Sequence, residues 1–182
     1  MRTLKYAILG LLNRGPMTGY DIKKAFDDRA LYNFWHAEHS QVYPELAKLV
    51  KEGLLDYETV ITGEELEKKL YRLTEKGAKD FHDWLIFDAE VDRTPKDTFR
   101  LRTYFYDSMD KEEYLELIQS QLVQHKERRD YLREIVFSAF KTIPDVGTPE
   151  LGDYLVLDGA IKREVAYIDW LNNCKEIINM SE

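Results

Sequence analysis

Three short segments near the N-terminus decide the fold: residues 18–22 (TGYDI), residues 40–46 (SQVYPEL) and residues 70–74 (LYRLT). The first opens a short helix. The second opens another helix with small polar and aromatic residues at its start. The third lies in a basic stretch rich in strand-forming residues. With an apolar helix before them, they give the order helix, helix, helix, hairpin, which predicts a winged helix-turn-helix, a module that lays one helix in the major groove of DNA.

The first two helices are predicted from apolar spacing and from signals at their ends. Apolar residues recur at helical spacing from Leu4 to Leu12, and Gly15 and Pro16 end that helix. Thr18 caps a second helix, with Asp21 in the capping-box position three residues later. The apolar side of this second helix is expected to consist of Tyr20, Ile22 and Phe26.

Pro44 fixes the start of the third helix, because proline is tolerated only in or near the first turn. We therefore expect this helix to begin at about Ser40 or Gln41 and to stop at Gly53. Residues 31–39, before it, are rich in aromatics and favour no class of structure. Its core face is expected to carry Val42, Leu46, Leu49 and Val50.

Residues 54–61 and 68–74 are rich in β-branched and aromatic residues around a polar tip, which predicts a two-stranded hairpin. Thr74 then opens a fourth helix. Its later part carries Phe81, Trp84 and Leu85.

The rest of the chain shows helical patterns and no strand pattern. Residues 88–95 are predicted to be a linker, and residues 96–108 a single helix. Asp110 caps a long helix that runs to about Phe140, and Pro149 starts a last helix that runs to about Asn179. The fold class is therefore mainly α, with a winged DNA-binding domain at 1–88 and a helical dimerisation and effector-response domain at 89–182.

Composition excludes some classes of protein and leaves DNA binding open. The formal net charge is −8, but residues 1–82 hold 13 basic and 13 acidic residues, so the excess lies beyond them. Where the cations sit matters more for DNA than the total charge. No apolar run approaches the roughly 20 residues that span a bilayer, and the N-terminal stretch lacks a small-residue cleavage site. The lone Cys174 cannot form an internal disulfide, so we expect a cytoplasmic protein.

The exposed face of the third helix and the hairpin supply the candidate DNA contacts. Gln pairs bidentately with adenine, Ser bonds to donors or acceptors, and Tyr touches a thymine methyl group or a phosphate. Lysines further along the helix contact the phosphate backbone. The alternative is a small α+β domain with a solvated polar helix face. The candidate DNA-binding residues are Ser40, Gln41, Tyr43, Lys48, Lys51, Lys68, Lys69 and Arg72.

Several motifs carry a resemblance to a known family. They are residues 4–12 (LKYAILGLL), 19–22 (GYDI), 40–46 (SQVYPEL), 66–69 (LEKK), 82–86 (HDWLI), 154–157 (YLVL), and Tyr167 with Trp170. By these motifs the chain resembles, over nearly its full length, the PadR family of winged-helix repressors. The resemblance implies base reading by Ser40, Gln41 and Tyr43 and wing contacts by Lys68 and Lys69. It also implies a homodimer on a two-fold symmetric, double-stranded operator and a response to hydroxycinnamic acids such as p-coumarate.

The long helix is about 45 Å long and needs partner helices along its apolar seam. The last helix supplies one partner, through Tyr154, Leu157, Ile161, Val165, Ile168 and Leu171, and a dimer supplies more. The seam is predicted to consist of Leu115, Ile118, Leu122, His125, Arg129, Leu132, Val136 and Ala139.

His125 and Arg129 interrupt this seam one turn apart, and two interpretations stay open. They mark a solvated bend or a polar layer that sets the helix register, or they form a cationic spot for a small aromatic carboxylic acid. Arg14 is a rival cation, and Asp153 stands where close relatives carry a histidine. The candidate effector-binding residues are Arg14, His125, Arg129, Asp153 and Tyr154.

The sequence offers little for an enzyme or a metal protein. His36, Glu38 and His39 match no standard zinc spacing, so no metal site is predicted. No phosphate-binding loop, dinucleotide turn or nucleophile elbow is present, so we expect neither catalysis nor a cofactor. The remaining alternative is a PadR-like regulator that senses a drug, a redox state or a protein partner.

Overall fold

The computed structural model describes residues 2–27, 29–33, 35, 39–62, 66–90 and 95–180. The chain divides into two compact units, Met1–Glu90 and Val91–Glu182, which are described separately below. The sequence placed this boundary two residues earlier, after Asp88.

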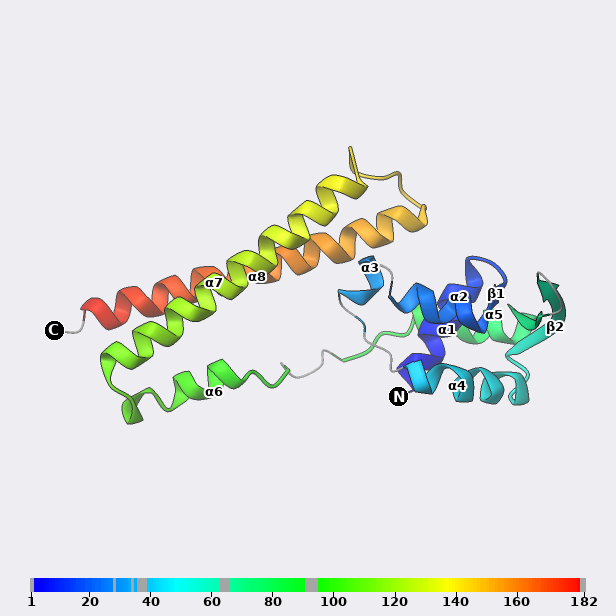
Figure 1. The fold of residues 1–182 in the computed structure, drawn as a ribbon, viewed down its shortest axis with the longest axis horizontal. Helices are drawn as coiled ribbons and strands as arrows, with labels where there is room; N and C mark the ends of the chain where they lie inside the picture. Colours follow the sequence, from blue (N-terminus) through cyan, green and yellow to red (C-terminus); the bar gives the residue numbers. More distant parts are fainter. Residues whose placement is uncertain are drawn as a thin grey trace. The chain divides into compact units, whose positions relative to one another are not determined.

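Unit 1 contains the helices and strands of a winged helix-turn-helix (Figure 1). The sheet is antiparallel, in the order β1-β3-β2, and the two long strands pair from Leu55↔Leu73 to Thr62↔Leu66. The predicted hairpin is therefore confirmed, and β1 adds a short third strand that the sequence did not reveal. The elements are α1 (Thr3–Asn13), β1 (Met17–Thr18), α2 (Gly19–Phe26), α3 (Arg29–Tyr32), α4 (His39–Lys51), β2 (Leu55–Thr62), β3 (Leu66–Leu73) and α5 (Glu75–Leu85).

Local hydrogen bonds explain where the helices of unit 1 begin. The Thr18 hydroxyl accepts from the Asp21 backbone N–H at 3.2 Å, and the Asp21 carboxylate accepts from the Thr18 N–H at 3.1 Å. The predicted capping box is thus confirmed. The Thr74 hydroxyl accepts from Gly77 N–H at 3.0 Å and donates to the Gly53 carbonyl at 2.8 Å. Thr74 therefore ties the start of α5 to the turn that ends α4.

The core of unit 1 lies between its helices and one face of the sheet. As predicted, α4 buries Val42, Leu46 and Leu49, and Val50 is half-buried against them. The expectation that Tyr20 lies on the apolar side of α2 is wrong, because this side chain is 62% exposed. The buried core residues are Ile8, Leu9, Leu12, Ile22, Phe26, Val42, Leu46, Leu49, Leu54, Leu55 and Tyr71.

Unit 2 is a long helical hairpin with a short helix beside it (Figure 1). Its elements are α6 (Thr98–Tyr104), the 3-10 turn η1 (Tyr106–Ser108), α7 (Lys111–Ala139) and α8 (Pro149–Met180). The prediction of one helix over residues 96–108 is wrong. Asp97 caps α6 by accepting from Arg100 N–H at 3.0 Å, and the chain turns at Phe105 so that the Tyr106 ring packs against Tyr114, with centroids 4.9 Å apart.

The seam between α7 and α8 partly follows the predicted stripe. Ile118, Leu122 and Leu132 are buried as expected, but Ala139 is exposed, so its assignment to the seam is wrong. The stripe drifts around the helix because a 3.6-residue turn does not match a seven-residue repeat. Two further α7 residues, Tyr114 and Ile135, are therefore buried. From α8 the buried residues are Leu157, Ala160, Glu164, Ile168 and Leu171.

Candidate nucleic-acid interface

Helix α4 carries apolar side chains on one side and polar side chains on the other. Val42, Leu46 and Leu49 are fully buried against the rest of unit 1. The opposite side is exposed and offers amide, hydroxyl, phenol and ammonium groups, which suit base edges and phosphates. The candidate DNA contacts that the structure places on this exposed side are Ser40, Gln41, Tyr43, Lys48 and Lys51.

The position of Tyr43 depends on the first residue of α2. Helices α2 and α4 pack against each other, and the Tyr43 ring lies over Gly19. A Cβ atom on Gly19 would lie only 2.6 Å from Cε1 of Tyr43. The ring is nevertheless 54% exposed, so it is held in place on one side and open on the other.

Pro44 lies inside α4, just after its first turn. Proline has no backbone N–H, so the Ser40 carbonyl receives no hydrogen bond from residue 44. The hydrogen-bond ladder of α4 therefore lacks one bond next to its first turn.

The three candidate cations of the wing lie on β3, but not on one face. Side chains alternate along a strand, so Lys69 lies on the face opposite Lys68 and Arg72. The Lys69 ammonium lies 4.2 Å from the ring centroid of Tyr57, an exposed aromatic that the sequence analysis did not single out. The alternation of side chains along the predicted strand could have identified Tyr57 as a candidate.

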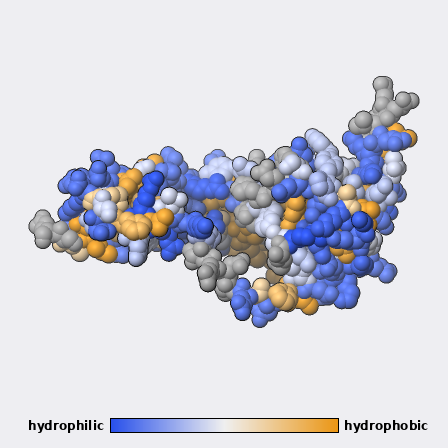
Figure 2. All heavy atoms as spheres, turned by 90° about the horizontal axis from the view of Figure 1, so that it is seen from below, coloured by the Kyte–Doolittle hydropathy of each residue, from blue (hydrophilic) through white to orange (hydrophobic). Residues whose placement is uncertain are grey.

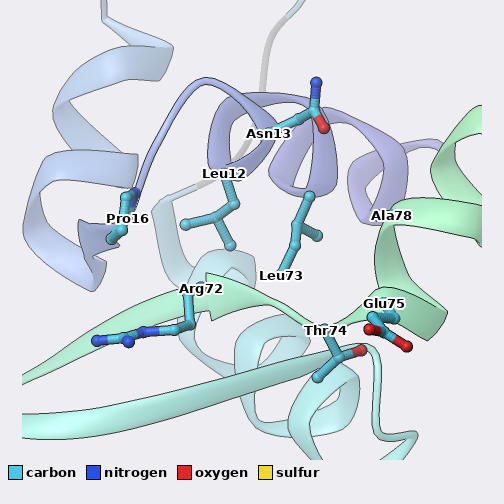
Figure 3. A pocket seen from close by; sticks show the side chains of 8 residues that line it. All are labelled: Leu12, Asn13, Pro16, Arg72, Leu73, Thr74, Glu75 and Ala78. Atoms are coloured by element: carbon cyan, nitrogen blue, oxygen red, sulfur yellow. The ribbon is translucent and has the colours of Figure 1, made fainter.

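Arg72 already has carboxylate partners within the sheet. It pairs with Glu58, and its Nε lies 3.9 Å from Oδ1 of Asp56. Arg72 also lines an open hollow of about 390 Å³ in unit 1 (Figure 3). Leu12 and Leu73 supply apolar groups to this hollow, and the Thr74 hydroxyl is engaged with backbone groups.

Arg2, which no sequence pattern indicated, is bound to two acids at α4. Its Nη2 lies 2.5 Å from Oε1 of Glu45, and its Nη1 lies 2.7 Å from Oε1 of Glu52. The hydrogen bond between Arg2 and Glu52 raises the pKa of Arg2 and holds the pKa of Glu52 below its ordinary value. No local signal predicts this contact, because the partners are 43 and 50 residues away.

In unit 2, His125 is paired with a buried carboxylate. Its Nδ1 lies 2.5 Å from Oε2 of Glu164, which is only 7% exposed, and its ring stacks on Tyr167 with centroids 4.0 Å apart. This geometry agrees with the interpretation of His125 as part of a polar layer between α7 and α8. Glu164 falls on the apolar stripe of α8, so its position in the sequence was a signal for its burial.

The Tyr167 hydroxyl donates to Oδ2 of Asp97 at 2.6 Å, which ties α8 to the start of α6. Burial raises the pKa of Tyr167, and the hydrogen bond to Asp97 raises it further. Burial by itself would raise the pKa of Asp97, but the hydrogen bonds from Tyr167 and from backbone N–H groups outweigh burial and lower it.

The other effector candidates lie at different places within their own units. Arg129 pairs with its neighbour Asp130, through Nε to Oδ1 at 2.8 Å and Nη2 to Oδ2 at 3.0 Å. Tyr154 packs edge-on against Phe140 and, with Asp153, lies about 15 Å along α8 from the level of Glu164. Arg14 belongs to unit 1 and directly follows α1.

Among the residues that the structure describes, no three metal-ligating side chains come together. The candidates His36 and Glu38 lie outside the described residues, as does the side chain of His39. Of the helices described, none is both long and apolar enough to cross a membrane.

Comparisons with known proteins agree over the whole chain. Residues 8–83 match the transcriptional regulator PadR-like family, and residues 95–179 match the C-terminal region of the virulence activator alpha family. The chain is 41% identical to the negative transcriptional regulator PadR of Bacillus subtilis, over 98% of this chain and 99% of the relative.

Two crystal structures of Bacillus subtilis PadR are also similar. The complex with operator DNA has a TM-score of 0.88 at 42% identity and covers 97% of this chain and 99% of that one. The complex with p-coumaric acid has a TM-score of 0.89 at 39% identity and covers 98% and 99%. Both units of the chain therefore have counterparts in one regulator.

Proposed function

The chain belongs to the PadR-like family of transcriptional regulators, and on that premise we propose that it is a sequence-specific DNA-binding repressor that phenolic acids release from its operator. It is a regulator rather than an enzyme. The observation that carries the proposal is the exposed side of α4, where reading groups and phosphate-binding groups lie on one helix with a fully buried opposite side. The similarity to a PadR complex with operator DNA supports the same role.

Within this function the residues of unit 1 divide by what they contact. Ser40, Gln41 and Tyr43 lie near the N-terminus of α4 and read base edges. Lys48 and Lys51 lie further along the helix and contact phosphates, as do Lys68 and Lys69 of the wing. Arg72 is the least available of the candidates, because Glu58 and Asp56 already balance its charge.

Unit 2 is the dimerisation and effector-response domain of this repressor. In Figure 2 orange, hydrophobic side chains are exposed on the face of unit 2 that is in view. Burying them against a second copy is favourable and gives the two-fold symmetry that a two-fold symmetric operator requires. The proposed location of this repressor is the cytoplasm. The exposed large apolar residues of unit 2 include Leu101, Tyr104, Phe105, Val123, Phe137, Leu155, Ile177 and Met180.

The effector is a hydroxycinnamic acid, in keeping with the PadR complex with p-coumaric acid. Its carboxylate requires a cation, and Arg14, His125 and Arg129 are the candidates, with Asp153 and Tyr154 as further contacts. One observation favours a second candidate function, a regulator of this family with a different signal. Glu164 already contacts Nδ1 of His125, and Asp130 already pairs with Arg129, so both side chains have partners before any acid binds.

Two measurements test the proposal. Selection from a random pool of double-stranded DNA should return a two-fold symmetric sequence; recovery of no preferred sequence would contradict the repressor function. Titration calorimetry with p-coumarate, with and without the selected duplex, then tests release. Linkage requires saturating duplex to weaken p-coumarate binding by the factor by which p-coumarate weakens duplex binding.

The same titration distinguishes the second candidate. Absence of binding heat with p-coumarate, together with intact duplex binding, would favour the regulator with a different signal. A thermal-shift comparison of phenolic acids with cationic drugs would then identify the class of ligand.

A further inference from the structure

Arg2 holds two carboxylates that belong to the proposed DNA-contact helix and its C-terminal end. Glu45 lies within α4, and Glu52 directly follows its last residue, Lys51. The two acids are seven residues apart, so they share one side of the helix. Their side chains are 15% and 33% exposed, and both oxygen partners of the single guanidinium lie within 2.7 Å. One guanidinium near the N-terminus therefore binds both acids and offsets one of their two negative charges.

Lys48 lies between these acids in the sequence. It is three residues after Glu45 and four before Glu52, and both spacings make neighbours on a helix. The hydrogen bond from Arg2 is the largest cause of the lowered pKa of Glu52, and the charge of Lys48 contributes less. Glu52 therefore already interacts electrostatically with Lys48, but its hydrogen-bonded partner is Arg2.

We propose that Arg2 is a positioning residue for operator binding, because by occupying Glu45 and Glu52 it leaves Lys48 to contact a DNA phosphate. This inference rests on the proposed function of the chain. Without Arg2, Lys48 pairs with Glu52, and uncompensated carboxylates lie beside the contact helix, where they repel phosphates. The same guanidinium also joins the start of α1 to α4, so the test must separate charge from structure.

The test measures the affinity of the full chain for the duplex selected above, by fluorescence anisotropy between 50 and 200 mM salt. Arg2→Ala should weaken binding about fivefold to tenfold and reduce the slope of log affinity against log salt by about 1.8, because each of the two subunits loses one phosphate contact worth about 0.9. Arg2→Lys keeps the charge and should retain most of the affinity.

The variant Arg2→Ala/Glu45→Gln/Glu52→Gln separates the two roles. The amides no longer attract Lys48, so affinity and salt slope should both return toward wild-type values, although the ion pairs are still absent. If Arg2 served only to hold the start of α1 against α4, this variant would bind as weakly as Arg2→Ala and would show the same salt slope as Arg2→Ala.

Lys5→Ala is the matched control. Lys5 lies on α1, three residues after Arg2, and pairs with a carboxylate at 2.5 Å, but its partner is Asp80 of α5. Its loss should leave operator affinity near the wild-type value. Unchanged binding by Arg2→Ala, or failure of the triple variant to recover, would overturn the inference. Failure of the wild-type chain to select any duplex would instead overturn the proposed function, before any variant is made.

Discussion

At the scale of single residues, the lack of a side chain at Gly19 decides where Tyr43 lies. Gly19→Ala should push the Tyr43 ring aside, since the new Cβ would lie 2.6 Å from Cε1. We expect weaker operator binding without loss of folding, because alanine is a better helix former than glycine.

A double-mutant cycle checks this prediction. In a Tyr43→Ala background, Gly19→Ala should cause no further loss of operator affinity. The two substitutions would then be coupled by a free energy of about 1 kcal/mol. If the losses from the two substitutions simply add, the ring is not what the glycine accommodates.

The residue scale also shows what the sequence could predict. Thr18 and Asp21, which form the capping box, are only three positions apart, so the local sequence alone could predict it. The partners of Arg2 and His125 are 43, 50 and 39 residues away, and only folding brings them together. The exposed side of α4 was predictable because helical periodicity and the position of Pro44 are both local.

At the scale of elements, a polar pair joins α7 to α8. His125→Leu should destabilise unit 2 by about 3 kcal/mol, because it removes the hydrogen-bond partner of the buried Glu164 carboxylate and leaves only the more distant Arg163, at 3.9 Å. The double variant His125→Leu/Glu164→Leu should recover most of this loss, since apolar side chains of similar volume suit the seam. Urea unfolding followed by circular dichroism measures both. Equal destabilisation of the single and double variants would rule out a buried unpaired charge as the cause.

The contact between α6 and α8 predicts a dependence on acid. Hydrogen bonds hold the pKa of Asp97 below its ordinary value of 3.8. A lowered pKa in the folded state stabilises the fold above the unfolded value, and this stability is lost as the pH falls through the folded value. Unit 2 of the wild type should therefore lose stability below about pH 4.

Asp97→Asn isolates this contribution. It should lower the stability by about 1–3 kcal/mol at pH 7, by losing a charge-assisted hydrogen bond. It should also lose less stability than the wild type between pH 5 and pH 3 in thermal melts. Parallel melting curves for the two proteins over that range would show that Asp97 does not carry the dependence.

Elements were less predictable where tertiary contacts override local pattern. The break after α6 at Phe105 follows from the packing of Tyr106 on Tyr114, which no spacing within residues 96–108 reveals. The strand β1 has only two residues and forms because Met17 and Thr18 pair with Tyr71 and Leu70 of β3.

At the scale of the whole molecule, the proposed dimer depends on unit 2. A fragment ending at Glu90 keeps its own core and should be monomeric, and it should lose most operator affinity because two linked half-site contacts exceed one by avidity. Light scattering and anisotropy measure the two properties. A fragment that is still dimeric would place the interface in unit 1.

The two buried clusters share no residue: one is built from unit 1, and the other from unit 2. Heating should therefore melt the chain in two calorimetric steps, each with its own enthalpy. A bound duplex should raise most the step that belongs to unit 1, by roughly 10 °C or more at a hundredfold excess over its dissociation constant. The step of unit 2 should instead rise with protein concentration, as melting coupled to subunit dissociation does. One calorimetric trace would thus report separately on unit 1, which binds the duplex, and on the dimer formed through unit 2.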